Sequence, residues 1–208
     1  MDKRIESLIK NWKKRNIVGW YCRNKKEGLE KLLELIPASA SVGFSGSQTL
    51  EELGIITLLE SKAHKVFNPY QAGLSRPESL ELRRQGAQAD LYLASANAIS
   101  EKGELVFFSA YGNRIAGVTY ARKVIVVCGT NKLTFHLEAA LKRAREHATP
   151  LNCRRLNWNA ACVKDGMCHS DICLWPDYKR MCCQILVIEA EIEAGRLQVV
   201  LVDETLGF

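Results

Sequence analysis

The residues with the most evident capacity for chemistry in this chain are cysteines near its carboxyl end. Six of the eight cysteines lie between residues 153 and 183, and the other two, Cys22 and Cys128, are predicted to be buried core residues. A dense group of cysteines in a cytosolic chain is more typical of metal binding or redox chemistry than of disulfide bonds. The segment also lacks regularly spaced apolar residues, whereas bonds between thiolates and a metal can order such a segment directly.

Four of these thiols are predicted to bind one metal centre: Cys162, Cys168, Cys173 and Cys182. Their irregular spacing within one loop favours an iron–sulfur cluster, most simply a 4Fe-4S cluster, over zinc, whose usual pattern has two closely spaced pairs. Zinc is the alternative, and free or redox-paired thiols are a third. Cys153, His169 and Cys183 are open as further ligands. We expect His169 to be an ordinary polar residue and Cys183 to be buried against the following strand.

A second group of residues, which follow the ends of predicted strands, could bind a small anion. The predicted ligand-binding residues are Ser45, Gly46, Ser47, Asn97, Asn113, Arg114 and Lys132. In the Gly/Ser turn, small residues let backbone N–H groups and a helix N-terminus approach an anion. Arg114 could grip a carboxylate or phosphate with two parallel bonds, and Lys132 would add a point charge. Glu101 is the nearest carboxylate available as a general base. Ordinary turns would also explain these residues.

Short apolar strands that alternate with helical stripes must position these groups. Such alternation predicts an α/β fold, with a mostly parallel sheet covered by helices on both faces. In such a sheet, ligands bind beyond the carboxyl ends of the strands. Strands are predicted at residues 41–44, 65–68, 90–94, 104–108, 123–128, 185–189 and 197–202, and helices near 5–12 and 29–36, from Thr49, and over 77–85, 113–118 and 134–146. Thr49 and Glu52 have the spacing of a capping box.

The length of 208 residues predicts one domain over 1–208, with an N-terminal helical segment at 1–37 and a cysteine-rich loop at 149–184. Residues 1–26 hold nine basic and two acidic side chains, which accounts for the net charge of +6. We interpret this segment as a surface helix with a basic face, and nucleic-acid binding is not favoured. No apolar run could span a membrane and no secretory signal is evident, so a cytoplasmic location is expected.

The motifs of several enzyme classes are missing. The chain has no G-x-G-x-x-G, P-loop, H-E-x-x-H or G-x-S-x-G sequence. The usual support for dinucleotide, nucleoside triphosphate, metalloprotease and hydrolase functions is therefore lacking.

An ordered series of motifs resembles the lactate-utilisation (LUD) domain family across about residues 1–203. The series consists of residues 44–49, 94–99, 103–106, Gly112-Asn113-Arg114 and 124–132. The resemblance implies an α/β sheet of the kind found in ribose-phosphate isomerases and CoA-transferases. It also implies a role near the oxidation of lactate to pyruvate, beside iron–sulfur, flavin or electron-carrier partners. Some short members carry a late four-cysteine loop, although two of the gaps are longer here, and Ser109 stands where members tend to have an acidic residue.

The sequence therefore predicts an iron–sulfur redox accessory protein that binds a small anion such as an organic acid. The alternatives are an isomerase- or transferase-like enzyme with Glu101 as base or nucleophile, and a non-catalytic ligand sensor. In both, the cysteine loop would be structural, with zinc or free thiols. A redox partner protein and a homo-oligomer are compatible with the sequence.

Overall fold

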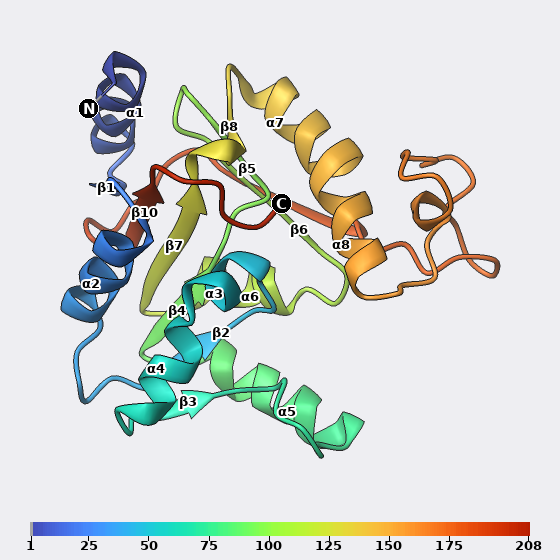
Figure 1. Ribbon diagram of the computed structural model, residues 1–208, viewed down its shortest axis with the longest axis horizontal. Helices are drawn as coiled ribbons and strands as arrows, with labels where there is room; N and C mark the ends of the chain where they lie inside the picture. Colours follow the sequence, from blue (N-terminus) through green and yellow to red (C-terminus); the bar gives the residue numbers. More distant parts are fainter. Residues whose placement is uncertain (1) are drawn as a thin grey trace.

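The central feature of the fold is a six-stranded parallel β-sheet (Figure 1). The computed structural model describes residues 2–208. The strands of this sheet lie in the order β1–β10–β7–β4–β2–β3. They are β1 (Val18–Cys22), β10 (Leu197–Val202), β7 (Lys123–Gly129), β4 (Leu91–Ala94), β2 (Val42–Phe44) and β3 (Val66–Phe67). The predicted α/β class with a mostly parallel sheet is confirmed.

The helices form because apolar stripes recur along them and polar side chains cap their ends. In α1, for example, Ile5, Leu8 and Trp12 are buried, and Asp2 caps the first turn. The helices are α1 (Lys3–Lys14), α2 (Lys25–Leu35), α3 (Gln48–Leu53), α4 (Ile55–Ser61), α5 (Arg76–Ala87), α6 (Asn113–Tyr120), α7 (Leu137–Arg143) and α8 (Thr149–Arg155).

The sheet separates two apolar clusters. Along β7, Val124 and Val126 face one cluster, and Ile125 and Val127 face the other. Helices α2, α3 and α4 cover the second cluster, whereas α1, α6 and another sheet cover the first. Burial of both faces explains why the strands are continuous apolar runs and do not alternate with polar residues.

The other sheet has four strands in the order β8–β5–β6–β9. They are β8 (Leu133–Thr134), β5 (Ala98–Ser100), β6 (Leu105–Ser109) and β9 (Gln184–Ile188). The sequence analysis predicted β6 and β9 as strands but did not separate them from the main sheet. β6 and β9 belong to this separate sheet because β6 turns back through a short loop and pairs antiparallel with β5. β9 then pairs antiparallel with β6. Helix α7 covers the outer face of this sheet through Ala140.

A continuous helical rod runs from α7 through a π-helical turn (η2, Ala144–Ala148) into α8. The predicted helix over 134–146 and the predicted loop from residue 149 need correction, because the helix continues past Pro150 to Arg155. A proline inside a helix cannot donate a backbone hydrogen bond to the preceding turn, and a π-helical turn before Pro150 accommodates this loss. The preceding turn widens, and both the amide and the hydroxyl of Thr149 donate to the carbonyl of Ala144. The irregular cysteine-rich segment therefore starts after Arg155.

Two further local predictions need correction. The stretch 1–37 is not wholly helical, because β1 lies between α1 and α2 and pairs with β10. Helix α3 is capped by Ser47, whose hydroxyl accepts from the amide of Leu50, and Thr49 is not its cap. Thr49 lies inside the helix, where its side chain is free for tertiary contacts.

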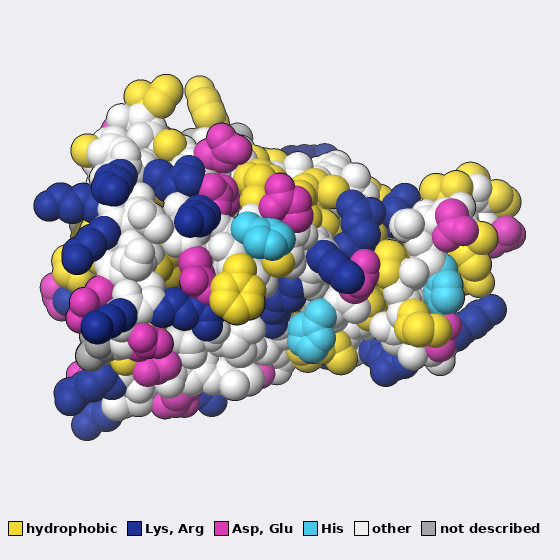
Figure 2. Space-filling view, turned by 90° about the horizontal axis from the view of Figure 1, so that it is seen from above, with side chains coloured by type: hydrophobic (Ala, Val, Ile, Leu, Met, Phe, Trp, Pro, Cys, Tyr) yellow, Lys and Arg dark blue, Asp and Glu magenta, His cyan; other side chains and the backbone are white. Residues whose placement is uncertain are grey.

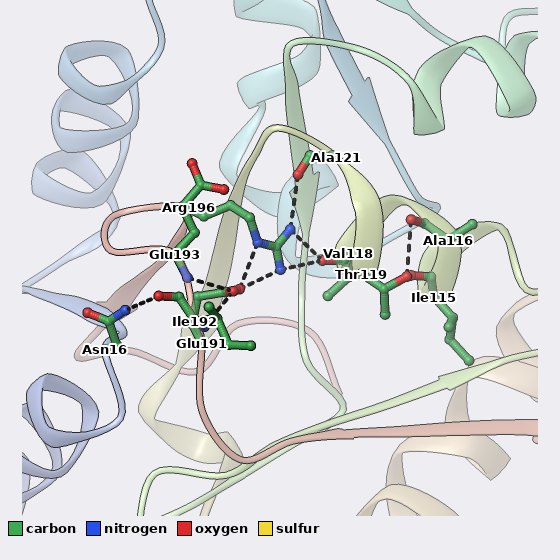
Figure 3. A network of polar contacts seen from close by, with 10 residues as sticks. All are labelled: Asn16, Ile115, Ala116, Val118, Thr119, Ala121, Glu191, Ile192, Glu193 and Arg196. Carbon is green, nitrogen blue, oxygen red and sulfur yellow. Dashed lines mark hydrogen bonds and ion pairs between the residues drawn. The ribbon is translucent and has the colours of Figure 1, made fainter.

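A buried ion pair fixes the connection between β9 and β10 (Figure 3). Arg196 pairs with Glu191 at 2.5 Å, and both side chains are about nine-tenths buried. The guanidinium also donates to the carbonyls of Val118 and Ala121 at the end of α6. This contact joins the amino end of β10 to the carboxyl end of α6.

Basic side chains are concentrated at one end of the surface, and exposed apolar side chains occur among charged ones at the other end (Figure 2). Lys and Arg side chains gather at the end where α1 and α2 lie, as expected from the charge of residues 1–26. At the other end the cysteine-rich segment exposes Met167, Ile172, Leu174 and Trp175. Among residues 2–208, no helix is long and apolar enough to cross a membrane.

The close approach of β2 to α5 at Gly43 makes a testable prediction. A Cβ atom on Gly43 in β2 would lie 1.9 Å from the carbonyl oxygen of Gly86 in α5. Neither backbone can yield without moving α5, so Gly43→Ala is expected to lower the free energy of unfolding by about 3 kcal/mol, the upper end of the usual cost of overpacking. Urea denaturation measures this change.

Gly86→Ala is the matched control. Its Cβ would make ordinary contacts at 3.4 Å, and alanine favours the helix, so its stability should stay within about 1 kcal/mol of the wild type. Equal stability of the two variants would contradict the packing described here.

Candidate functional site

The first candidate site is an open pocket at the carboxyl ends of β2, β4 and β7. These strands are neighbours, so the residues that follow them meet at one edge of the sheet, as expected for a parallel sheet. The lining residues are Gly46, Ser47, Gln48, Thr49, Ser95, Ala96, Asn97, Arg114, Lys132, Ala148, Asn152 and Phe208. Five of the seven predicted ligand-binding residues therefore come together here.

Lys132 is the most buried charge of the pocket. It leaves β7 through a single 3-10 turn (η1, Thr130–Lys132), and its side chain is only 3% exposed. The ammonium Nζ donates to Thr49 Oγ1 and Ser95 Oγ, both at 2.8 Å, and to the carbonyl of Ala96 at 3.3 Å. Burial lowers the pKa of Lys132 from its ordinary value to about 8, so the side chain is mostly charged at neutral pH.

Arg114 is the second cation of the pocket and projects from the first turn of α6. Its guanidinium donates to Ser45 Oγ, Asn97 Oδ1 and the carbonyls of Phe108 and Gly46, at 2.7 to 3.3 Å. All four acceptors are uncharged. The group is thus held in one orientation and acts chiefly as a fixed positive charge, rather than as the free two-pronged clamp that the sequence predicted.

The pocket has an excess of positive charge. Arg143 stands close by and donates to the carbonyl of Asn97 at 2.7 Å. Within the part of the chain that the structure describes, no carboxylate lies within ion-pair distance of Lys132, Arg114 or Arg143. Neutral acceptors satisfy the hydrogen bonds of buried cations, but they do not neutralise the charge. An anion in this pocket would supply the missing negative charge.

The Gly/Ser turn contributes differently from what was expected. The amide of Gly46, a predicted anion donor, instead donates to the phenolic oxygen of Tyr70 at 2.6 Å. Helix α3 has six residues, so it adds little dipole to the site. Ser45 is buried and orients Arg114, and Ser47 caps α3 at the pocket rim. The turn therefore shapes the pocket and holds Arg114 in place.

Three predicted residues, Ser45, Asn113 and Glu101, are not among those that line the pocket. Asn113 starts α6, and its carbonyl accepts from the buried phenol of Tyr92. Glu101 lies in the loop between β5 and β6 and pairs with Arg4 of α1. Its own backbone carbonyl accepts from Asn11. Glu101 thus attaches α1 to the second sheet, and its assignment as a general base stays a prediction without a place in this pocket.

The second candidate site is a pocket lined by thiols in the cysteine-rich segment. Cys162, Cys168, Cys173 and Cys182, the four predicted metal ligands, all line it. A fifth cysteine, Cys153, lines it as well, from α8. Cys183 does not. Its side chain is exposed and contacts the carbonyl of Arg180, so the expectation that it is buried against β9 is wrong.

The thiols of this pocket lie in a partly apolar environment. Burial raises the pKa of Cys153, and the neighbouring thiols of Cys162, Cys182 and Cys173 raise it further. Arg145 and Arg180 line the same pocket, and the buried Nε of Arg180 has no hydrogen-bond partner within residues 2–208. His169 pairs with Asp165 at 2.6 Å. In the described chain, no three His, Cys, Asp or Glu side chains are arranged closely enough to hold a metal ion.

The two pockets share a wall, which is the rod formed by η2 and α8. Ala148 and Asn152 line the cationic pocket, and the residues that follow them, Thr149 and Cys153, line the thiol pocket. Figure 1 shows α8 between the sheet and the cysteine-rich segment. Only the thickness of one helix separates the two sites.

Three residues of the cationic pocket, Thr49, Ser95 and Asn152, were not predicted from the sequence. Thr49 and Ser95 each follow a strand of the central sheet, which was the available signal. Asn152 gave no such signal, because the helix that presents it continues past Pro150. Cys153, which the sequence left open as a further ligand, lines the thiol pocket. Cys22 and Cys128 are buried in the two main apolar clusters, as predicted.

Comparison with known proteins agrees with this architecture. Among solved structures, a DUF162 family protein from Deinococcus radiodurans superposes with a TM-score of 0.56 at 11% identity and covers 96% of each chain, which shows a common fold. The eIF2B delta structure from Chaetomium thermophilum is also similar, with a TM-score of 0.31 at 19% identity, over 68% of this chain and 54% of that one. No curated protein matches the sequence.

The family itself is shown by sequence. The LUD domain is matched by residues 5–202, which include every strand of both sheets and both pockets except Phe208. The chain therefore belongs to the LUD domain family.

Proposed function

We propose that this protein is a redox accessory protein of organic-acid oxidation. It binds a small organic anion, such as lactate or pyruvate, in the cationic pocket and holds an iron–sulfur centre in the thiol pocket. The observation that carries the proposal is the shared wall: a pocket with uncompensated positive charge and a pocket lined by five cysteines lie on opposite sides of α8. Family membership adds support for a role near lactate oxidation.

The anion is bound mainly by fixed charge. Lys132 and Arg114 already donate to neutral oxygens, so they are held in place before the anion arrives and lose little freedom on binding. Their charges act at short range in a partly buried site, where the effective dielectric constant is well below that of water. Ser47, Asn97 and Asn152 supply polar groups at the rim. A carboxylate fits this charge, and its small apolar remainder faces Ala96 and Ala148.

The thiol pocket has the donors that an iron–sulfur centre requires. Cys162, Cys168, Cys173 and Cys182 would hold the cluster, which supplies single-electron transfer when bound. Arg180 offers an unused buried N–H, of the kind that donates to cluster or thiolate sulfur and adjusts its potential. Arg145 adds positive charge beside the thiolates.

A first experiment tests the anion site. Pyruvate and L-lactate are titrated into the protein at pH 7, and binding is followed by calorimetry and by the shift in unfolding temperature. Lys132→Met removes a unit charge at short range, so affinity is expected to fall at least about tenfold. Lys10→Met, on the exposed face of α1, changes the net charge equally and should bind like the wild type. Equal affinity of the two variants would refute the assigned role of Lys132.

The lowered pKa of Lys132 predicts two opposite pH dependences. Without ligand, the unfolded chain holds the lysine proton more tightly than the folded one, so stability should rise from about pH 8 to 10.5, by up to about 3 kcal/mol. The stabilisation by pyruvate should instead fall as pH rises through about 8, because the ammonium loses its charge. Thermal unfolding from pH 7 to 10.5 measures both, and Lys132→Met should lack both trends.

A second experiment tests the metal centre. Protein purified anaerobically is analysed for iron, zinc and acid-labile sulfide, and its visible and electron paramagnetic resonance spectra are recorded. Stoichiometric iron and sulfide with a broad visible absorption are expected, and Cys162→Ser or Cys173→Ser should lose them. One zinc per chain without visible absorption would replace the redox proposal with a structural site, and the absence of any metal would refute both.

A further inference from the structure

Cys153 differs from the other cysteines of the thiol pocket in how it is held. It is fully buried and belongs to α8, whereas the rest follow in the irregular segment or in one 3-10 turn. Its carbonyl accepts from the amide of Trp158, and Thr149, one turn earlier, bonds to Ala144. The position of Cys153 is therefore fixed by the body of the domain and does not depend on order in the loop.

Cys153 lies among other cysteines, unlike a cysteine in an ordinary apolar core. Cys153 packs in one small cluster with Cys162, Cys173 and two alanines, and the partly buried Trp158, Val163, Tyr178 and Met181 pack against it. Its Sγ lies 3.8 Å from the Sδ of Met181, the residue before Cys182. A lone buried cysteine usually acts as a small hydrophobe, as Cys22 and Cys128 do in clusters of aliphatic residues. Three thiols that face one pocket do not fit that description.

The cysteine-rich segment also needs an attachment to the rest of the protein. Residues 156–183 contain one 3-10 turn and no strand, and several of their large apolar side chains are exposed. A metal bound only by thiolates from this segment would order it internally but would leave it joined to the body by its two ends. A ligand on α8 would couple that order to the folded domain, because metal-binding energy contributes directly to folding.

We propose that Cys153 of α8 is itself a ligand of the metal centre and attaches that centre to the wall of the cationic pocket. This inference rests on the metal centre proposed above. The thiol loses its proton when the metal binds, and the sulfur then joins those of Cys162, Cys173 and Cys182 in the place assigned above to Cys168, which is not among the cysteines that pack against Cys153. Asn152, which precedes Cys153 in the sequence, lines the cationic pocket and donates to Met181 Sδ at 3.0 Å. Two consecutive residues of one helix thus serve the two sites.

Cobalt binding tests this proposal without requiring cluster assembly. The full-length chain, freed of metal and sulfide under anaerobic conditions, is titrated with Co²⁺, and the near-ultraviolet thiolate-to-cobalt absorption is recorded. Cys153→Ala should weaken Co²⁺ binding by more than the roughly tenfold that loss of an outer-shell partner costs, and should lower the absorption per cobalt. Cys22→Ala is the matched control, since it removes a buried thiol elsewhere. Wild-type affinity and absorption in Cys153→Ala would overturn the proposal.

A measurement on the wild type tests the same proposal without requiring Cys153→Ala to fold. In moderate urea, the rate at which iodoacetamide labels each cysteine is followed by mass spectrometry with and without Co²⁺. Bound Co²⁺ should slow the labelling of Cys153 at least as much as that of Cys162, and more than that of Cys22. Labelling of Cys153 that slows no more than that of Cys22 would overturn the proposal.

The two proposals fail in different ways. If the wild type assembles no iron–sulfur cluster but binds Co²⁺ through Cys153, the redox function is wrong and the ligand assignment stands. If the cluster assembles equally in the wild type and in Cys153→Ala, the ligand assignment is wrong and the redox function stands.

Discussion

The burial of a positive charge at the carboxyl edge of the central sheet is the constraint that organises this protein. Lys132 is enclosed by hydroxyl and carbonyl oxygens from the ends of β2 and β4, and no carboxylate approaches it in the described structure. Burial of an unpaired cation is unfavourable, and the lowered pKa reflects that cost. The anion proposed to bind here would offset that cost. The surrounding turns hold Arg114 in a fixed orientation.

The helical rod on the other side of this pocket links the two candidate sites. Its π-helical turn follows from Pro150, and π-helical turns often occur at functional sites. The widened turn lets the helix continue at the position where a sequence pattern would end it. Residues 148 and 152 then line the cationic pocket, and residues 149 and 153 line the thiol pocket. A change in charge in one pocket alters the electrostatic potential in the other, because only α8, a region of low dielectric constant, lies between them.

Much of the site could be predicted from the sequence because its residues follow strands. Ser45, Asn97 and Lys132 each lie within three residues of the end of a strand, and parallel strands place their carboxyl ends together. The four loop cysteines were recognisable for a similar reason, since a thiol-rich segment without apolar periodicity needs a metal or a disulfide to order it. Glu101 was chosen only as the nearest carboxylate. The structure gives it a partner, Arg4, that lies 97 residues away in the chain.

The sequence alone determined the α/β class, the buried strands and the polar groups at their ends, because hydrophobic periodicity and turn chemistry are local properties. The tertiary structure decided what each polar group contacts. It assigned the amide of Gly46 to Tyr70, placed Thr49 against Lys132, and brought Cys153 to thiols far along the chain. Such contacts depend on the distance between segments remote in sequence, and that distance is set by how helices and sheets pack, which no local pattern contains.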